Sequence, residues 1–503
     1  MPNPKEQIFN ADHLKTGMKE RAVKSAGITL AAQGIKLILQ LGSIAILARL
    51  LQPSDFGLIA MVTVFTGLAL QFMEGGLSMA TIQRDQITHA QVSNLFWVNG
   101  ALGTVLCLLG ILISPLVATI YDEPRLTLVM AAMSLTFLIG GLSVQHDALL
   151  RRQMRFKAIS VIDIVSMAAG IIAGIAAALG GLEYWALVIS PITTFATKTV
   201  MRWLSARWVP SMMSRGSGVR PLLGFGANLT GANFIGYMAT NLTPFAVGYI
   251  GGAQSLGLFN RANTLTSIPS SQLLPPIINV LQPTVARIAD NPEKLNRTMR
   301  SLMGKLALVS TLITVTMALL ADWIVFVFLG PSWTEAIPLF RLLAVYSFIQ
   351  PLAGLIAVAL IAAGESRAMI ASKFHSLVIT VAALLIGSYW GVSGIVLAFS
   401  LSGLLIRLPV FLYYSSRFLP LSFWEFSKPI FPALACAVLT TAVIILARGF
   451  VEVANPIVGL LVFVPACVLV YLCACLLIKP ARVDLVELLA SLRLIYSRKS
   501  TKN

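Results

Sequence analysis

The chain has little charge and few titratable acids, and these shortages exclude several classes of protein. Only 11% of its 503 residues are charged, with 20 acidic residues, 37 basic residues and four histidines. A soluble globular domain carries about 25% charged residues. The sequence also has no glycine-rich nucleotide-binding loop and no HExxH pattern. A soluble enzyme, a nucleotide-binding protein and a zinc hydrolase are therefore poor descriptions of this chain.

Cysteine is also scarce, and its spacing fits no familiar site. The last two cysteines are separated by one residue, which matches neither a zinc knuckle nor a redox CxxC pair. All five lie inside apolar runs, where we predict that they act as apolar fillers: Cys107, Cys436, Cys467, Cys473 and Cys475. We predict no metal site and no cofactor.

Apolar residues dominate what is present. Hydrophobic residues make up 57% of the chain, and the mean hydropathy is +0.84. Many apolar runs are continuous and approach the ~20 residues that a helix needs to cross a bilayer. Strands of a membrane barrel would instead alternate apolar and polar residues. The sequence predicts an all-α integral membrane protein.

We predict about fourteen transmembrane helices. The first run is too long for a signal peptide and lacks a convincing cleavage site, so we expect it to remain as the first helix. The eighth span is rich in polar residues and proline, which suits a kinked helix beside a wet cavity. The predicted spans are 25–47, 56–80, 93–118, 127–148, 158–180, 183–205, 222–250, 256–282, 302–329, 336–362, 368–389, 392–413, 429–448 and 456–478.

The distribution of Lys and Arg predicts the orientation. Cationic residues concentrate in the termini and in alternate loops, whereas the opposite loops contain only Arg49, Arg125 and Arg448. By the positive-inside rule both termini are cytoplasmic. We expect the basic arm 1–24 and the basic tail 479–503 to rest on anionic lipid headgroups. Because the cations are dispersed over many short loops, nucleic acid is not an expected partner.

The helices divide into two sets of seven, and one local similarity suggests an internal repeat. A Gly-Leu step opens the next helix after the first span, at Gly57, and again after the seventh span, at Gly257. Two repeated bundles around a central cavity are typical of transporters with alternating access. The predicted divisions are an arm 1–24, a bundle 25–205, a linker 206–221, a second bundle 222–413, two further helices in 414–478 and a tail 479–503.

Several short motifs resemble one family when they are taken in order. The sequence is similar to the Wzx-type polysaccharide flippases, of the colanic-acid and exopolysaccharide type, within the multidrug/oligosaccharidyl-lipid/polysaccharide exporter superfamily. The resemblance runs from about residue 25 to 430. The motifs that carry it are ARLLQPSDFGL at 48–58, IQR at 82–84, SNLFWVN at 93–99, LLRRQMRF at 149–156, GLFNRA at 257–262 and GPSW at 330–333.

The resemblance implies a pair of helical bundles around a cavity that opens alternately to each side. It implies a substrate made of an oligosaccharide on undecaprenyl diphosphate, carried from the cytoplasmic to the periplasmic leaflet of a bacterial inner membrane. Exopolysaccharide or lipopolysaccharide biosynthesis would use the product, and polysaccharide polymerase or export machinery would be a partner. No catalytic residue is expected.

Polar residues inside the first span form one stripe. Gln33, Lys36 and Gln40 are spaced by three and four, so they share a helical face. A charge inside the bilayer marks a cavity or a partner. Lys36 is expected to line a hydrated cavity and to contact diphosphate, or else to form a structural ion pair. Glu74 and Asp163 are the acids that could pair with it or titrate during coupling.

Two further helices carry candidate substrate-binding residues. In the seventh span Asn233, Tyr237 and Asn241 form a stripe that either binds sugar hydroxyls or makes interhelical hydrogen bonds. In the eighth span Arg261 suits phosphate through its planar fork, although it could also reach the outer surface, and Gln272 follows it.

The remaining predictions concern charged residues and competing functions. Asp147 and His146 are expected in a cytoplasmic salt-bridge cluster with Arg151 and Arg152. Lys198 is a weaker candidate that lies within its span but could reach the surface. A small-molecule or drug antiporter of the same superfamily is the alternative function. A membrane-bound polymerase, ligase or glycosyltransferase is the second rival, and the short outer loops argue against it.

Overall fold

The chain is helical, and two compact units make it up. The computed structural model describes residues 9, 18–74, 78, 81–82, 84, 86–214, 220–288, 291–419, 422–451 and 453–500, and no strand occurs among them. The first unit spans Met1–Gly257 and the second spans Leu258–Asn503. The sequence predicted a linker at 206–221, about forty residues before this boundary. The division into domains made from the sequence stays a prediction.

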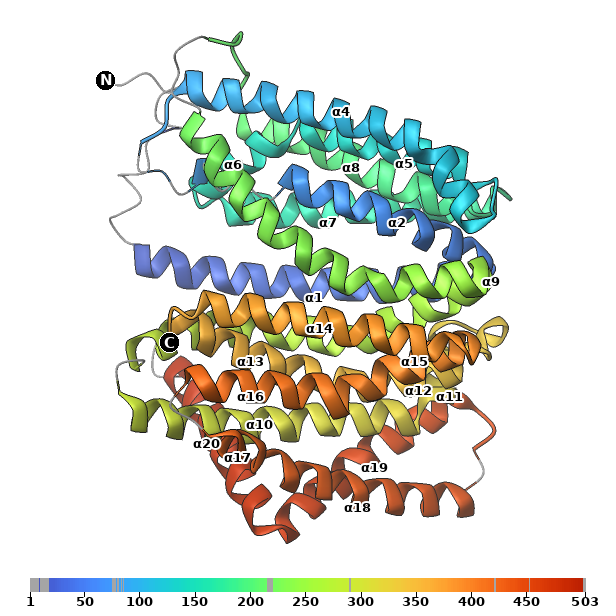
Figure 1. The fold of residues 1–503 in the computed structure, drawn as a ribbon, viewed down its shortest axis with the longest axis vertical. Coiled ribbons are helices and arrows are strands. Elements are labelled where there is room, and N and C mark those ends of the chain that lie inside the picture. Colours follow the sequence, from blue (N-terminus) through green and yellow to red (C-terminus); the bar gives the residue numbers. More distant parts are fainter. Residues whose placement is uncertain are drawn as a thin grey trace. The chain divides into compact units, whose positions relative to one another are not determined.

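The first unit is a bundle of long helices (Figure 1). Its elements are α1 (Met18–Leu50), α2 (Pro53–Glu74), α4 (His89–Tyr121), α5 (Leu126–Gly141), α6 (Val144–Arg152), α7 (Phe156–Leu179), α8 (Trp185–Ala206) and the first part of α9 (Arg220–Ile288). α9 is broken at Gly252, whose φ of 67° lies in the left-handed region that glycine tolerates. The predicted boundary between the seventh and eighth spans lies at this break.

The second unit contains the rest of α9 and the helices that follow it. Its further elements are α10 (Pro292–Leu319), α11 (Ala321–Phe328), η2 (Pro331–Trp333), α12 (Ala336–Ser347), α13 (Ile349–Ala362), α14 (Ser366–Ser388), α15 (Gly391–Ser402), η3 (Gly403–Arg407), α16 (Leu408–Phe418), α17 (Phe423–Ser427), α18 (Ile430–Phe450), α19 (Pro456–Leu477) and α20 (Lys479–Ser500).

Local sequence explains where several helices begin. Thr88 and Gln91 form a reciprocal capping box at the start of α4. Asn291 caps α10 through the backbone N–H of Lys294, and a proline follows it at the first turn. A capping box between Ser422 and Glu425 starts α17. These polar caps lie at the ends of apolar segments and set the limits of the helices.

Ten described helices are long and apolar enough to cross a membrane, or eleven if α5 and α6 form one span bent by 42°. The predicted all-α membrane fold is confirmed, whereas the count of fourteen spans stays a prediction. α8 and α9 cover the predicted sixth to eighth spans and are not among the ten. α8 carries several polar residues, among them Thr193, Lys198 and Arg202, and two of these belong to the site described below.

Packing inside each unit is dense, while much apolar surface stays exposed. In the second unit Met303, Leu352 and Phe426 belong to one buried cluster. Leucines such as Leu112 and Leu461 expose more than two thirds of their surface. Apolar exposure on this scale suits contact with lipid rather than water. The described cysteines are free thiols, four of them buried, and Cys473 is exposed.

Candidate functional site: a charged network inside the first unit

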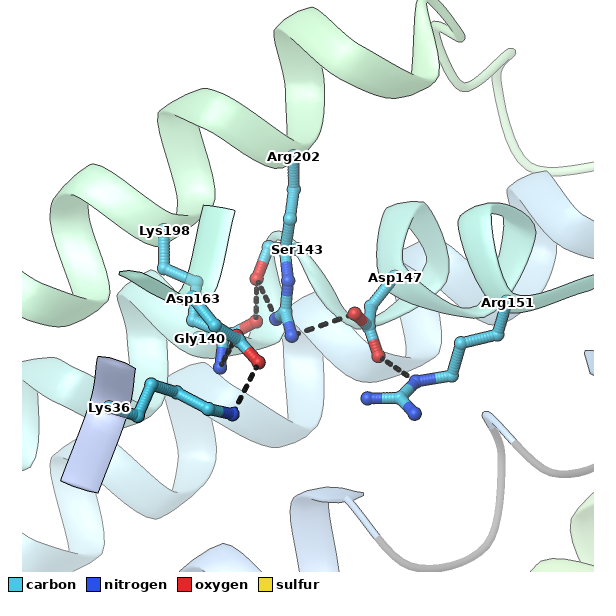
Figure 2. A network of polar contacts seen from close by, with 8 residues as sticks. All are labelled: Lys36, Gly140, Ser143, Asp147, Arg151, Asp163, Lys198 and Arg202. Carbon is cyan, nitrogen blue, oxygen red and sulfur yellow. Dashed lines mark hydrogen bonds and ion pairs between the residues drawn. The ribbon is translucent and has the colours of Figure 1, made fainter. Parts of the chain in front are cut away.

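Two lysines from different helices share one carboxylate in the first unit. The Lys36 ammonium on α1 lies 3.4 Å from Asp163 on α7, and the Lys198 ammonium on α8 lies 3.0 Å from the other oxygen of the same carboxylate. Figure 2 shows the two lysines converging on Asp163. A carboxylate within an apolar helix needs compensating charge, and here it has two cations. The three groups together carry a formal charge of +1.

A second carboxylate is shared in the same way. Arg202 on α8 donates to Asp147 on α6 over 2.9 Å, and Arg151 donates to the other oxygen of Asp147 over 2.6 Å. Arg202 also donates to the Ser143 hydroxyl over 3.1 Å, and that hydroxyl donates to the Gly140 carbonyl. We call these six charged residues, Lys36, Asp147, Arg151, Asp163, Lys198 and Arg202, the charged network. Four cations and two carboxylates give it a formal charge of +2.

Helical spacing places these side chains together. Lys198 and Arg202 are four residues apart on α8, as are Asp147 and Arg151 on α6, so each pair lies on one face. α8 therefore presents one cation to each carboxylate. The bend of 42° between α5 and α6 starts α6 in a new direction just before Asp147. The network therefore combines side chains from α1, α6, α7 and α8.

Small residues allow α7 and α8 to approach closely. A β-carbon added at Gly170 would lie 1.9 Å from the Thr194 hydroxyl and 2.6 Å from the Ser190 carbonyl. At Gly174 it would lie 2.9 Å from the Ser190 side chain. Interfaces between membrane helices favour small residues for this reason. The close contact holds α7 against α8, next to the Asp163–Lys198 ion pair.

The network is partly accessible. The side chains of Lys36, Lys198 and Asp163 are 35%, 30% and 23% exposed, whereas that of Arg202 is 14% exposed. Surplus positive charge that reaches solvent attracts anions, and amide and hydroxyl groups beside it offer further hydrogen bonds. The arrangement suits the binding of a negatively charged group and contains no nucleophile with an activating base.

The polar stripe on α1 is partly buried within the first unit. Gln33, Lys36 and Gln40 are all half-buried rather than sealed or fully exposed. Lys36 forms the ion pair that the sequence offered as the alternative to a cavity-lining role. Because Asp163 is shared with Lys198, the pair does not cancel the local positive charge. A contact between Lys36 and diphosphate stays a prediction, and the side chain of Glu74 lies outside the described residues.

The stripe on α9 makes helix-to-helix and local contacts. The Tyr237 hydroxyl donates to the backbone carbonyls of Thr63 and Val64 on α2, over 2.9 and 3.0 Å. The Asn241 amide donates to the Tyr237 carbonyl over 3.0 Å. The interhelical alternative is therefore present for Tyr237, and binding of sugar by either residue stays a prediction. The side chain of Asn233 lies outside the described residues.

The candidates at the later end of α9 belong to the second unit. Arg261 donates to the Asn260 side chain over 3.3 Å, and both Arg261 and Gln272 are half-buried. The structure thus assigns Lys36 and Arg261 to different units. Their joint action on one substrate stays a prediction.

The expected cluster at the end of α6 is present in part. Asp147 pairs with Arg151 as expected, but His146 instead stacks on Trp203 and contacts the Trp208 carbonyl over 3.2 Å. Arg152 bonds to backbone carbonyls, among them those of Phe9 and Thr81, rather than to Asp147.

Two members of the network, Lys198 and Arg202, were not predicted from the sequence as binding residues. Lys198 was only a weaker candidate that could reach the surface, yet both side chains bind carboxylates inside the bundle. Their spacing of four residues within a helix was the available signal. In the described part of the chain, no group of three or more His, Cys, Asp or Glu residues has metal-binding geometry.

Comparison with known proteins places the chain among polysaccharide biosynthesis proteins. The family model described as "Polysaccharide biosynthesis protein" matches residues 46–338. Lipopolysaccharide biosynthesis protein WzxC of Escherichia coli strain K12 is 27% identical over 76% of this chain and 79% of its own length. Teichuronic acid biosynthesis protein TuaB of Bacillus subtilis strain 168 is 26% identical over 70% of each chain. Succinoglycan biosynthesis transport protein ExoT of Rhizobium meliloti strain 1021 is 25% identical over 62% of each.

Solved structures share the fold at low sequence identity. The lipid II flippase MurJ in an inward closed conformation aligns with a TM-score of 0.68, covering 91% of this chain and 98% of its own at 11% identity. An inward-facing multidrug transporter of the MATE family aligns with a TM-score of 0.59, covering 78% and 95% at 14% identity. These likenesses establish a membrane transporter fold.

Proposed function

The chain belongs to the polysaccharide biosynthesis protein family, and from that premise we propose that it flips a lipid-linked oligosaccharide across a bacterial membrane. The proposed substrate is an oligosaccharide on undecaprenyl diphosphate, moved from the cytoplasmic to the periplasmic leaflet. The proposed location is the inner membrane, with both termini in the cytoplasm. The product would enter exopolysaccharide or lipopolysaccharide synthesis.

The charged network is the observation that carries the substrate proposal. The barrier to flipping is the transfer of a diphosphate and its sugars through hydrocarbon, where unpaired charges cost many kcal/mol. A network with a formal charge of +2, part of it solvent-accessible, replaces water around an anionic head. Lys36 and Lys198 flank Asp163 and are both partly exposed, so we assign them the diphosphate.

The mechanism we propose is alternating access. The lipid tail stays in the bilayer while the head crosses, and the two lysines exchange Asp163 for phosphate oxygens when the head arrives. Charge-assisted hydrogen bonds of this kind are stronger than neutral ones. Gln33 and Gln40, on the same face of α1 as Lys36, donate to the glycan. Release returns both lysines to Asp163, so neither charge is left bare between cycles.

The direct test is leaflet transfer in vesicles. Purified protein is reconstituted with a fluorescent undecaprenyl-diphosphate oligosaccharide, and head exposure is followed with a membrane-impermeant quencher. Lys36→Gln and Lys198→Gln should each slow transfer at least tenfold. Lys157→Gln is the matched control, because Lys157 is an exposed cation near the start of the same helix as Asp163 and outside the network. Equal transfer by wild type and both network variants would refute the assignment.

Exchanging the charges at positions 36 and 163 distinguishes a role of this ion pair in transport from a role in folding. The double variant Lys36→Asp with Asp163→Lys keeps the net charge and allows an ion pair between the two exchanged positions, but it moves the α1 cation to α7, next to Lys198. A purely structural pair predicts restored transfer. The diphosphate proposal predicts a folded protein with slow transfer, because the cation no longer lies beside Gln33 and Gln40.

The alternative function is that of a small-molecule antiporter. The fold of this chain is shared by a MATE transporter. The antiporter alternative predicts that the reconstituted chain moves cationic dyes down an ion gradient and ignores the lipid-linked sugar. The names of the relatives, which concern polysaccharide and teichuronic acid biosynthesis, favour the flippase. They also support transport rather than catalysis. The same vesicles measure both activities side by side.

A further inference from the structure

A small cavity in the second unit is lined by cations and hydroxyls and by no acid. It has a volume of about 180 Å³ and lies among α12, α13, α14, η3 and α16. Its polar lining consists of Arg407, Lys373, Tyr346, Ser372 and Ser376. The rest of the lining is apolar. Several water molecules, or one phosphate-sized group with water, fit this volume.

A local distortion of the helix brings Arg407 to this cavity. α15 and α16 are joined by the π-helical turn η3, in which the Leu408 N–H donates to the Gly403 carbonyl. Pro409 has no N–H, so it interrupts the regular ladder at this point. π-turns of this kind are frequent at functional sites. The Arg407 guanidinium lies close to Gly403, where an added β-carbon would be 2.9 Å from its Nη2.

The partners of Arg407 among the described residues are neutral. It lies over the rings of Phe399 and Tyr346, with its guanidinium carbon 4.3 and 5.1 Å from their centroids. It donates to the Thr380 hydroxyl over 3.3 Å and to the Phe399 carbonyl. Its Nε is buried without a hydrogen-bond partner. In the described part of the chain no carboxylate pairs with Arg407 or with Lys373.

A buried cation without a counter-charge is costly, and ring faces and carbonyls compensate only part of the cost. In the first unit every lysine and arginine of the charged network has a carboxylate. Arg407 differs from all of them. An anion in the cavity would supply the missing charge, and Lys373, with the hydroxyls of Ser376 and Tyr346, would supply further donors.

We propose that this cavity binds a phosphate group. Arg407 provides the planar donor fork, and Lys373 closes the exposed side. The phosphate is carried by a membrane lipid or is free in solution. Exposed apolar side chains on two of the elements that line the cavity, Ile370 and Phe374 on α14 and Leu405 on η3, favour a lipid, whose acyl chains would cover them. This site lies within the second unit and does not depend on the transport proposal.

The test is binding to the purified, delipidated full-length chain. Photoreactive phosphatidylglycerol and diacylglycerol with the same tails are compared, and crosslinked peptides are identified by mass spectrometry. Phosphatidylglycerol should label peptides of α14 and α16, and diacylglycerol should not. Inorganic phosphate is titrated separately, with the thermal unfolding midpoint as readout, and it identifies a free anion as the ligand if it alone stabilises the chain.

Variants of the two cavity cations test their role in binding. Arg407→Gln should weaken phosphate or phosphatidylglycerol binding at least tenfold, because a charge-assisted hydrogen bond is lost. Arg417→Gln is the control, since Arg417 is a cation on α16, which directly follows η3, and it stacks on Tyr413 outside the cavity. Lys373→Gln, at an exposed position, serves if the first variant does not fold. Equal labelling by both lipids without stabilisation by phosphate, or unchanged binding in both cavity variants, would overturn the proposal.

Discussion

Gly57 and Gly257 each pack against the backbone four residues before the other. A β-carbon on Gly57 would lie 1.7 Å from the Ala253 carbonyl oxygen, and one on Gly257 would lie 1.8 Å from the Pro53 carbonyl oxygen. The start of α2 and residues 253–257 of α9, all within the first unit, therefore cross at backbone contact. The glycines of the two Gly-Leu steps that the sequence indicated as a local repeat both lie at this crossing.

This crossing predicts a strong effect of one methyl group. Gly57→Ala and Gly257→Ala should each destabilise the chain by about 1–3 kcal/mol, because rigid backbone cannot yield to the added atom. Thermal unfolding in detergent measures the loss. Gly42→Ala on α1 is the control, since nothing lies within 4 Å of its added carbon. Equal midpoints for Gly57→Ala and Gly42→Ala would contradict the close crossing.

Arg152 holds separate segments of the first unit together. It is 6% exposed, and it donates to the Phe9 carbonyl over 3.0 and 3.1 Å and to the Thr81 carbonyl over 3.1 Å. Arg152→Lys keeps the charge but loses the planar set of guanidinium donors. It should lower the free energy of unfolding by about 2–4 kcal/mol, because carbonyl groups are left without hydrogen bonds. Protease cleavage near Phe9 should become faster. Unchanged cleavage, with Lys157→Gln as the matched control, would show that the carbonyl contacts do not restrain this segment.

Tyr237 offers a test of the interhelical alternative. Tyr237→Phe removes the donor to Thr63 and Val64 but keeps the ring against Gly67, where an added β-carbon would lie 2.3 Å from the hydroxyl. We expect a loss of about 0.5–1.5 kcal/mol in stability and little change in vesicle transfer. A large loss of transfer at normal stability would instead support the sugar contact.

Asp484 makes the docking of α20 sensitive to pH. Burial, with help from nearby Glu487, raises the pKa of Asp484 from 3.8 to about 6, against the opposing effect of Lys305 and Arg300. Because the pKa of Asp484 is raised in the folded chain, its contribution to stability is fully present below pH 3.8 and is lost as the pH rises through 6. Because the group is half-exposed, the effect is about 1 kcal/mol or less.

Hydrogen exchange of α20 checks this pH dependence. Protection should fall between pH 5 and pH 7.5 in wild type and stay constant in Asp484→Asn. The pKa of Glu487 is lowered, first by the hydrogen bond from Lys305 over 3.1 Å and then by that from Ser301, so its contribution is present above pH 4.5 and is lost in stronger acid. The two groups therefore act in opposite directions and mainly in different pH ranges. A wild-type profile that is flat from pH 5 to 7.5 would exclude the Asp484 effect.

Individual residues show how far the sequence could predict the site. Gln33, Lys36 and Gln40 shared a helical face by spacing alone, and all three are half-buried in the structure. The partner of Lys36 could only be narrowed to Glu74 or Asp163, because both acids lie far from it along the chain. The cation that shares Asp163 was not found, since the depth of Lys198 depends on how α8 packs against α7.

Composition and hydrophobic run length determined by themselves that this chain is a helical membrane protein, because a bilayer leaves backbone groups no other partner. They also determined which residues are too polar for lipid. Only the tertiary structure decided that Asp147 and Asp163 each pair with two cations, whereas Arg407 pairs with no carboxylate of the described residues. Ion pairing depends on distances of a few ångströms between helices that are remote in sequence, and helical periodicity carries no information about those distances.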